Sequence, residues 1–143
     1  MGTRILIADH HASFRQSLAR YLAMLDASYE VVGEAATDDV AMAQVGRLRP
    51  DVVFVDIDLP DRNGLATTRR ICARWPMTAV IALSSHPDVE YHQAALDAGA
   101  TSCIDKLTLV DRLPEALLAA RRSLASRASE PPNAIKELPE ATV

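Results

Sequence analysis

Short apolar runs alternate along the chain with segments of helical periodicity. Most of the runs consist almost continuously of Val, Ile, Leu, Phe and Ala, which is typical of strands that are covered by helices on both faces. They lie at residues 4–8, 30–35, 51–55, 79–83 and 101–104. The pattern therefore predicts five strands in a parallel central sheet.

A helix is expected after each strand, because apolar residues recur there every three or four positions. The second helix should end at Arg49, since the residue before a proline avoids the α region. Pro76 and Gly99 mark the ends of the third and fourth helices. The helical segments lie near residues 14–25, 41–48, 64–75, 87–98 and 109–124.

Alternating strands and helices predict right-handed crossovers and a doubly wound α/β fold. The expected strand order is 2-1-3-4-5, as in flavodoxin-like sheets, which places strands 1, 3 and 4 side by side. Asp9, Asp56 and Ser84 directly follow the first, third and fourth apolar runs, and Lys106 comes shortly after the fifth. Because such sheets bind ligands at the carboxyl ends of their strands, we expect one acidic pocket with a cation at its edge.

The length of 143 residues is typical of a single domain. After residue 126 the helical pattern dissolves into a segment rich in Ala, Pro and Glu that has no usable period. We therefore expect a folded domain at residues 1–126 and a disordered or linker-like tail at residues 127–143.

Charge and hydropathy argue against several classes of protein. The net charge of −4 and the pI of about 5.5 disfavour direct nucleic-acid binding, which needs a broad basic surface. No stretch approaches the ~20 apolar residues of a membrane span, so no membrane partner is expected. Cys72 and Cys103 lie in different elements without paired spacing, as expected of buried thiols in a reducing compartment. The expected location is the cytoplasm.

Asp9, Asp56, Ser84 and Lys106, in this order in one short α/β chain, resemble the site of a response-regulator receiver domain. The resemblance covers about residues 3–125. Within it, the segments 5–15, 31–36 and 90–100 are most similar to the NarL/FixJ subgroup. The resemblance implies two-component signalling, in which the domain takes a phosphoryl group from a sensor histidine kinase.

The same resemblance assigns a role to each residue of the site. It makes Asp56 the phosphoacceptor, Ser84 the hydroxyl that turns toward the phosphoryl group, and Lys106 the cation that pairs with the phosphoryl oxygens. A Mg²⁺ ion would be held by Asp9, Asp56 and the backbone carbonyl of Asp58. An aspartate attacks a phosphoryl group only if the negative charge gathered there is offset, and Mg²⁺ with a lysine supplies that charge.

Two residues depart from the receiver pattern. His10 stands where receivers usually carry a second carboxylate, and an imidazole is a poor ligand for a hard cation, so the affinity for Mg²⁺ should fall. Cys103 stands where the family usually places a tyrosine or phenylalanine that rotates when the domain is phosphorylated. A thiol is too small to act as the same switch, although Tyr91 and His92 lie nearby in the fourth helix.

Each candidate residue also has an ordinary structural interpretation. An aspartate at the end of a strand is often a turn or cap residue, and a serine or lysine in a loop is equally common. Cys103 is a typical small core residue. His10 is most simply a helix-start residue that binds nothing. A transition-metal site that includes His11 and His86 lacks any firm metal spacing.

Three functions are compatible with the sequence. The first is a phosphoacceptor receiver, a signalling domain that is not otherwise an enzyme and that switches a protein-interaction surface. The second, suggested by His10 and Cys103, is a degenerate receiver that binds partners without phosphorylation. The third is a magnesium-dependent phosphatase, because Asp56-Ile57-Asp58 resembles the D-x-D signature of haloacid-dehalogenase-type enzymes, although so short a chain cannot supply their further motifs and cap.

The subgroup resemblance also bears on the partners of the domain. Similar receivers usually precede a helix-turn-helix domain, so the chain is expected to be stand-alone or the N-terminal part of a DNA-binding transcriptional regulator. The resemblance implies a homodimer through the face formed by the fourth helix, the fifth strand and the fifth helix.

Overall fold

The computed structural model describes residues 2–60, 64–86 and 88–129, so most of the predicted tail lies outside the described residues. Within these ranges five parallel strands form one sheet in the order β2-β1-β3-β4-β5, which confirms the predicted flavodoxin-like topology. Each strand boundary lies within one residue of the predicted one. The strands are β1 (Thr3–Ala8), β2 (Tyr29–Ala35), β3 (Val52–Asp56), β4 (Ala79–Ser84) and β5 (Ser102–Asp105).

The described part of the chain contains five α-helices and a short 3₁₀ helix, η2 (Lys106–Thr108). The last α-helix continues to Ala128, two residues beyond the predicted limit of the folded domain. The second ends at Leu48, one residue before the predicted end, and its C-cap residue Arg49 adopts a left-handed conformation (φ 48°) before Pro50. The α-helices are α1 (Ala12–Leu25), α2 (Asp38–Leu48), α3 (Gly64–Arg74), α4 (Val89–Asp97) and α5 (Leu109–Ala128).

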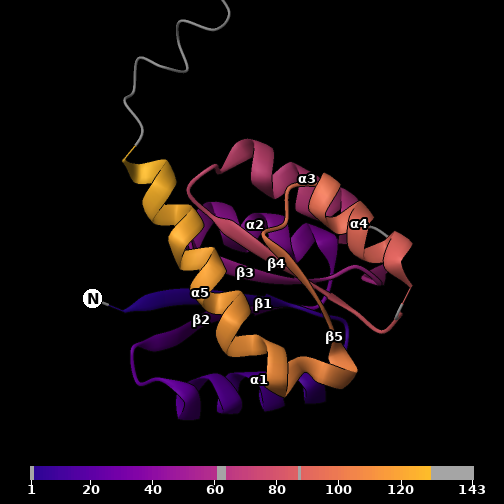
Figure 1. The fold of residues 1–143 in the computed structure, drawn as a ribbon, viewed down its shortest axis with the longest axis horizontal. Helices are drawn as coiled ribbons and strands as arrows, with labels where there is room; N and C mark the ends of the chain where they lie inside the picture. Colours follow the sequence, from indigo (N-terminus) through magenta and orange to yellow (C-terminus); the bar gives the residue numbers. More distant parts are fainter. Residues whose placement is uncertain (1, 61–63, 87, 130–143) are drawn as a thin grey trace, which may run out of the picture.

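The helices cover the sheet in two layers (Figure 1). α1 and α5 pack on one face, and α2, α3 and α4 pack on the other. Successive residues of β3 alternate between the two apolar cores, so that Val53 and Val55 contact the α2 to α4 side while Val52 and Phe54 contact the α1 and α5 side. Every residue of β3 and β4 is buried, as the unbroken apolar runs predicted.

The strand register places the first two candidate residues level with each other. Ala8, the last residue of β1, pairs with Val55 of β3. Asp9 and Asp56 are the next residues along these two neighbouring strands, so their side chains emerge together at the carboxyl edge of the sheet. This edge is where an open α/β sheet presents its ligand site.

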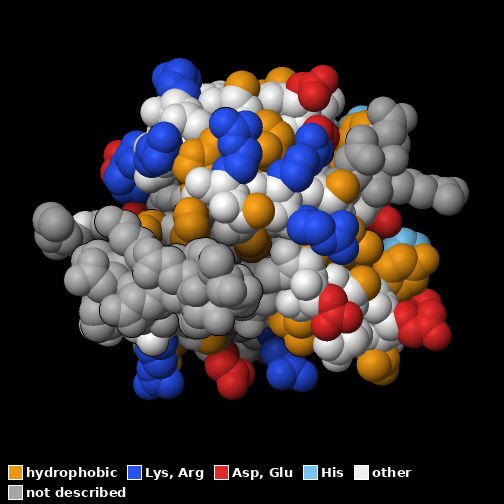
Figure 2. Space-filling model, turned by 90° about the horizontal axis from the view of Figure 1, so that it is seen from above, with side chains coloured by type: hydrophobic (Ala, Val, Ile, Leu, Met, Phe, Trp, Pro, Cys, Tyr) orange, Lys and Arg blue, Asp and Glu red, His pale blue; other side chains and the backbone are white. Residues whose placement is uncertain are grey.

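Positive charge gathers on the helical face that looks upward in Figure 1, which Figure 2 shows from above. α3 contributes Arg69, Arg70 and Arg74, which are all exposed. Contacts within the domain engage two of these arginines, since Arg70 pairs with Asp38 of α2 and the Arg74 guanidinium lies 4.7 Å from the centre of the Trp75 ring. Two of the three arginine side chains on this face therefore already have partners within the domain.

The start of α3 is packed closely against the end of β3. A Cβ atom added at Gly64 would clash with the backbone carbonyl oxygen of Asp56 and with the backbone of Ile57. Those neighbours are main-chain atoms of a buried segment, so they cannot move aside as a flexible side chain would. Gly64 therefore lets α3 begin directly beside Asp56.

Replacing Gly64 with alanine is expected to lower the free energy of unfolding by about 1–3 kcal/mol, the usual cost of overpacking, or by more because the clash is with backbone. Gly46→Ala is the matched control, since its added Cβ would lie 3.3 Å from a ring carbon of Trp75 and alanine favours the interior of α2. Urea unfolding of both variants measures the difference. Equal stability of the two variants would contradict the proposed close packing.

Candidate functional site

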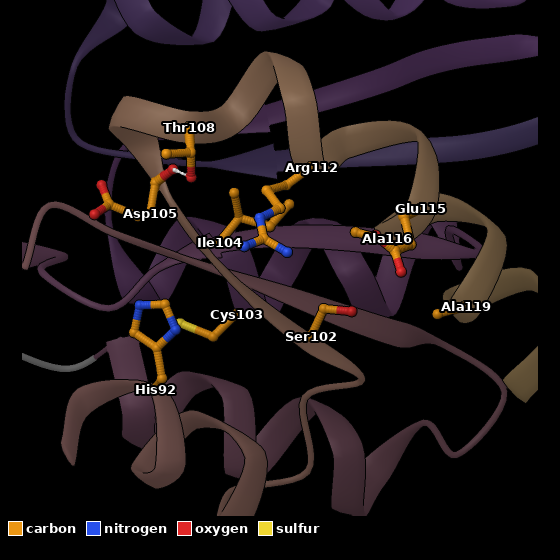
Figure 3. Close-up of a pocket in the computed structure, with 10 residues that line it drawn as sticks. All are labelled: His92, Ser102, Cys103, Ile104, Asp105, Thr108, Arg112, Glu115, Ala116 and Ala119. Atoms are coloured by element: carbon orange, nitrogen blue, oxygen red, sulfur yellow. Dashed lines mark hydrogen bonds between the residues drawn. The ribbon is translucent and has the colours of Figure 1, made fainter. Parts of the chain in front are cut away.

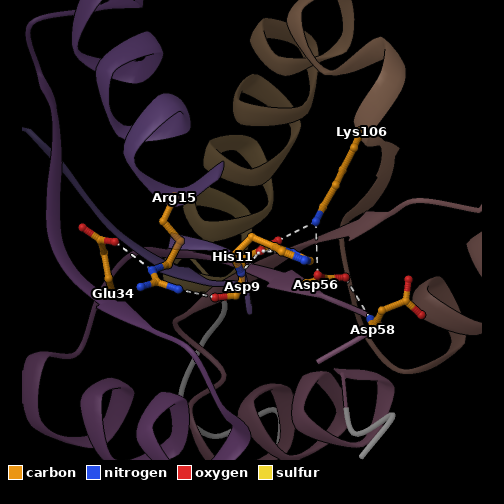
Figure 4. A network of polar contacts seen from close by, with 7 residues as sticks. All are labelled: Asp9, His11, Arg15, Glu34, Asp56, Asp58 and Lys106. Carbon is orange, nitrogen blue, oxygen red and sulfur yellow. Dashed lines mark hydrogen bonds and ion pairs between the residues drawn. The ribbon is translucent and has the colours of Figure 1, made fainter. Parts of the chain in front are cut away.

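Two carboxylates and one ammonium group meet at the carboxyl edge of the sheet (Figure 4). Nζ of Lys106 lies 2.6 Å from Oδ2 of Asp9 and 3.1 Å from Oδ2 of Asp56. The Asp9 side chain is fully buried and that of Asp56 is 3% exposed. The structure thus brings together three of the residues that the sequence singled out, while their chemical roles stay predictions.

Backbone amides fix both carboxylates from the opposite side. The N–H of His11 donates to Oδ1 of Asp9 at 2.8 Å, and the N–H of Asp58 donates to Oδ1 of Asp56 at 2.8 Å. Each carboxylate therefore has one oxygen on an amide and the other on the Lys106 ammonium group. These contacts leave lone pairs on both carboxylates, because each carboxylate offers about four acceptor positions.

The electrostatics of the pocket favour additional positive charge. Burial raises the pKa of Asp56 and the negative charge of Asp9 acts in the same direction, which outweighs the Asp58 amide and the Lys106 charge. Burial lowers the pKa of Lys106, but the hydrogen bond to Asp9 and the charges of both carboxylates outweigh burial, so the net shift is upward. When both carboxylates are ionised, the ammonium group of Lys106 neutralises only one of them, so the three side chains together carry a net negative charge.

The turn after β5 holds Lys106 in position. The Asp105 side chain accepts a hydrogen bond of 2.9 Å from the N–H of Leu107, which starts the 3₁₀ helix η2. The Lys106 ammonium group also lies 4.3 Å from the centre of the Phe14 ring in α1, within the range of a cation–π interaction. The sequence gives no signal for this contact, because spacing along a helix carries no information on a contact with a distant loop.

The Ser84 hydroxyl is engaged by the loop that follows β4. It donates to the carbonyl oxygen of His86 at 2.9 Å and accepts from the N–H of His86 at 2.9 Å. Ser84 is buried, so these bonds satisfy a hydroxyl that would otherwise be costly to enclose. The backbone of Ile57 joins the same two strand ends, since its N–H donates to the carbonyl oxygen of Leu83 at 2.9 Å.

His11, rather than His10, lies beside the two carboxylates. Its Nδ1 atom is 3.5 Å from Oδ1 of Asp9, and one ligand atom each from Asp9, His11 and Asp56 lie within 4.8 Å of one another. His10 is exposed, and its ring packs edge-on against the ring of His11 with centroids 5.1 Å apart. The signal in the sequence was the position of His11 two residues after Asp9, at the N-terminus of α1, where the backbone turns back toward the strand.

A further set of contacts connects the site to α4. Nε2 of His86 lies 3.2 Å from Oδ2 of Asp58, and the His86 ring stacks on Tyr91 with centroids 4.8 Å apart. The His86 and Asp58 side chains are 45% and 41% exposed, so their ion pair contributes little to stability. The contact between His86 and Asp58 is structurally important because it joins the loop after β3 to the loop after β4.

A groove of about 530 Å³ lies on the face formed by α4, β5 and α5 (Figure 3). Cys103 of β5 lines it together with His92 of α4 and with Arg112 and Glu115 of α5, and Figure 3 shows the thiol directed toward the His92 ring. Burial, and then the charge of Asp105, raise the pKa of Cys103 to about 11, so the thiol is neutral at physiological pH. The small side chain at position 103 thus leaves a groove on the face that the resemblance associates with switching.

A family model described as the response regulator receiver domain matches residues 5–118. The chain therefore belongs to the response regulator receiver domain family, the class of signalling domains that the fold and the grouped Asp9, Asp56 and Lys106 suggested. Within the described residues no helix combines the length and the hydrophobicity that crossing a membrane requires.

Curated relatives include transcriptional regulators and enzymes that carry such a domain. The transcriptional regulatory protein DegU of Brevibacillus brevis is 36% identical over 114 residues, which is 80% of this chain and 48% of the relative. A protein-glutamate methylesterase/protein-glutamine glutaminase of Anaeromyxobacter dehalogenans (strain 2CP-C) is 38% identical over 103 residues, 72% of this chain and 30% of the relative. The chain spans about half the length of the transcriptional regulators that it matches.

Solved structures confirm the fold and the resemblance to the NarL/FixJ subgroup. The signal receiver domain of the response regulator NarL from Mycobacterium tuberculosis is 26% identical, with a TM-score of 0.75. The match covers 84% of this chain and 97% of that structure.

Replacing Asp56 with asparagine should increase stability at pH 7.5 by about 1 kcal/mol, the size of many single stabilising substitutions, because it removes a buried charge beside Asp9 while Lys106 keeps its contact with Asp9. The pKa of Asp56 is raised above 3.8 in the folded state, so its ionisation destabilises the fold fully above the raised pKa and not at all well below 3.8. The gain should therefore shrink as the pH falls toward 3.8. Urea unfolding between pH 5 and pH 7.5 measures it.

Asp97→Asn, on the exposed end of α4, is the control for this prediction and should change stability little at any pH. A loss of stability in Asp56→Asn at pH 7.5, or a gain that grows toward acid pH, would contradict the raised pKa.

Proposed function

We propose that this domain accepts a phosphoryl group on Asp56 from a sensor histidine kinase in the cytoplasm, and in response changes a protein-interaction surface. The observation that carries the proposal is the contact of the buried Asp56 carboxylate with Lys106, at 3.1 Å, beside the second carboxylate of Asp9. Membership of the receiver family supports it. The domain itself then needs no other catalytic activity.

In the proposed reaction a carboxylate oxygen of Asp56 forms a bond to phosphorus while the bond from phosphorus to the leaving atom breaks. That atom is a kinase imidazole nitrogen, or an acetate oxygen when acetyl phosphate is the donor, and it keeps the electron pair. The product is an acyl phosphate with about two negative charges, by analogy with other phosphorylated side chains. The ammonium group of Lys106 is close enough to offset part of that charge.

The carboxylates of Asp9 and Asp56 fit the role of magnesium ligands, since Mg²⁺ usually takes one or two carboxylates plus waters. The backbone carbonyl of Asp58 is the proposed third protein ligand. A bound divalent cation supplies positive charge opposite the oxygens of the transferring group. Because His10 replaces the usual second carboxylate and the nearest further side chain is the His11 imidazole, we expect the affinity for Mg²⁺ to be low.

Ser84 and Lys106 are the proposed switch residues. To reach a phosphoryl group on Asp56, the Ser84 hydroxyl must redirect the hydrogen bond that it donates to the His86 carbonyl oxygen toward a phosphoryl oxygen, and it must give up the bond that it accepts from the His86 N–H. This exchange costs little in hydrogen bonding, because charged acceptors form the stronger bonds. It would free the loop before α4 and so alter the face formed by α4, β5 and α5.

Transcriptional regulation is the proposed output of a longer protein of which this domain is the N-terminal part. The support is the similarity to transcriptional regulatory proteins of which the chain covers about half. DNA contact would then belong to another domain, in keeping with the net charge of −4 of this chain. A stand-alone receiver would instead act through its surface alone.

Phosphorylation is tested by the intact mass of the protein after incubation with acetyl phosphate. We expect a gain of one phosphoryl group that requires a divalent cation, is absent in Asp56→Asn and persists in Asp97→Asn. His10→Asp, which restores the usual second carboxylate, should increase the rate at low Mg²⁺ concentration.

No gain in mass under any condition, with a folded protein, would overturn the proposal and favour a receiver that binds partners without phosphorylation. Turnover of a phosphomonoester would instead favour the phosphatase activity suggested by the Asp56-Ile57-Asp58 signature. The family match over residues 5–118 gives that activity no support beyond this signature.

We propose that the face formed by α4, β5 and α5 mediates homodimerisation when Asp56 is phosphorylated. In a two-fold interface a contact from one residue to another is repeated in the reverse direction, so Arg112 of one copy can face Glu115 of its partner twice. Arg112→Glu should weaken the dimer at least about tenfold, and Arg112→Glu with Glu115→Arg should restore it.

Sedimentation with a beryllofluoride phosphoryl mimic measures the dimer, with Arg69→Glu on the exposed side of α3 as the control. If the protein sediments only as a monomer, with and without the mimic, the proposed homodimer is wrong. Equal weakening by Arg69→Glu would show that the interface lies elsewhere.

A further inference from the structure

We propose that the pocket binds a divalent transition-metal ion through Asp9, Asp56 and the imidazole of His11, in preference to Mg²⁺. The inference extends the proposed function, because the pocket is the same one, and it specifies which class of cation that pocket selects. It concerns metal binding itself and can be tested without any phosphoryl transfer.

The three side chains already approach the arrangement of a metal site. Their ligand atoms lie within 4.8 Å of one another, whereas the ligands of a tetrahedral metal ion with bonds of about 2.0–2.2 Å are ~3.3–3.6 Å apart. Closing the set therefore needs a movement of at most about 1–1.5 Å. His11 can supply this movement, because its side chain is 66% exposed while the two carboxylates are buried and held by backbone amides.

The backbone directs the imidazole toward the carboxylates. His11 has an extended conformation (φ −98°, ψ 114°) at the start of α1, and its N–H donates to Oδ1 of Asp9. The same oxygen is the one that lies 3.5 Å from Nδ1 of His11. A cation between these two atoms can leave the Lys106 bond to Oδ2 of Asp9 intact, so the metal and the lysine need not compete for the same oxygen.

The donor set decides which cation fits. Mg²⁺ selects oxygen ligands and near-octahedral geometry, whereas imidazole nitrogen suits Zn²⁺, Ni²⁺, Fe²⁺ and Co²⁺. Two carboxylates with one imidazole hold a transition metal through three protein ligands and leave the remaining positions to water or to phosphoryl oxygens. The negative charge that remains in the pocket, with Asp9 and Asp56 ionised beside Lys106, adds attraction for any dication.

Tighter binding of Zn²⁺ than of Mg²⁺ would not by itself demonstrate the proposed site, since almost any site with nitrogen and oxygen ligands has this preference. The distinguishing property is the dependence on one imidazole. His11 should contribute to the affinity for Co²⁺ and Zn²⁺ and contribute nothing to the affinity for Mg²⁺. The neighbouring imidazole of His10, which lies outside the cluster, provides the comparison.

The experiment measures dissociation constants for Mg²⁺, Co²⁺ and Zn²⁺ by calorimetry on the full chain without an affinity tag, and records the visible absorption spectrum of the Co²⁺ form. Three variants are compared with the parent protein: His11→Ala, His10→Ala and Asp9→Asn. Circular dichroism confirms that each variant is folded.

We expect His11→Ala to weaken Co²⁺ and Zn²⁺ by about 10- to 100-fold, with the Mg²⁺ constant unchanged within about twofold, and to shift the Co²⁺ spectrum because a nitrogen ligand is lost. His10→Ala should retain parental constants, and Asp9→Asn should weaken all three metals. If His11→Ala binds Co²⁺ and Zn²⁺ as tightly as the parent, the inference is wrong. It is equally wrong if His10→Ala loses as much affinity, or if Asp9→Asn loses none, because the metal then sits on exposed histidines.

The proposed function is judged separately, by the gain of one phosphoryl group on Asp56 in the presence of Mg²⁺. If the parent protein is phosphorylated and His11→Ala binds Co²⁺ and Zn²⁺ as tightly as the parent, only the metal inference is overturned. Failure of phosphorylation with the expected loss of Co²⁺ affinity overturns the phosphoacceptor function and leaves the metal site in place.

Discussion

The ammonium group of Lys106 is the interaction on which the site depends. Two carboxylates, one fully buried and one 3% exposed, lie at the ends of neighbouring strands, and each would be costly to ionise there alone. Lys106 contacts both, and it comes from the turn after β5. The turn after β5 thus supplies the charge that offsets the carboxylates at the ends of β1 and β3, and removing the ammonium group, which would leave two buried negative charges without a partner, would cost on the order of 3–5 kcal/mol.

Most of this arrangement could be predicted from the sequence, because a buried parallel strand leaves a clear signal. Asp9 and Asp56 each follow an unbroken apolar run, and the pairing of Ala8 with Val55 makes the residue after each run meet its counterpart. An error of one residue at a strand end does not change this result, since the run itself locates the edge of the sheet. The order 2-1-3-4-5 then followed from the alternation of strands and helices.

The remaining features depend on side-chain directions, which periodicity does not encode. By resemblance His10 stands at the position of the second carboxylate, and the ring that approaches Asp9 is that of the next residue, His11, whose backbone amide is bound to the same carboxylate. The engagement of the Ser84 hydroxyl by His86 depends on the path of one short loop. The small size of Cys103 is visible in the sequence, but the groove beside it depends on where the neighbouring helices place their side chains.

His86 connects the two halves of the proposed switch. Its backbone binds the Ser84 hydroxyl, its ring contacts the Asp58 carboxylate, and the same ring stacks on Tyr91 of α4. Movement of Ser84 toward a phosphorylated Asp56 would remove the first of these contacts. A change at Asp56 would therefore reach α4 through contiguous contacts even though position 103 carries no aromatic ring. The His86 ring already stacks on Tyr91 of the helix that borders the groove, so this route from the Ser84 loop to α4 needs no aromatic ring at position 103.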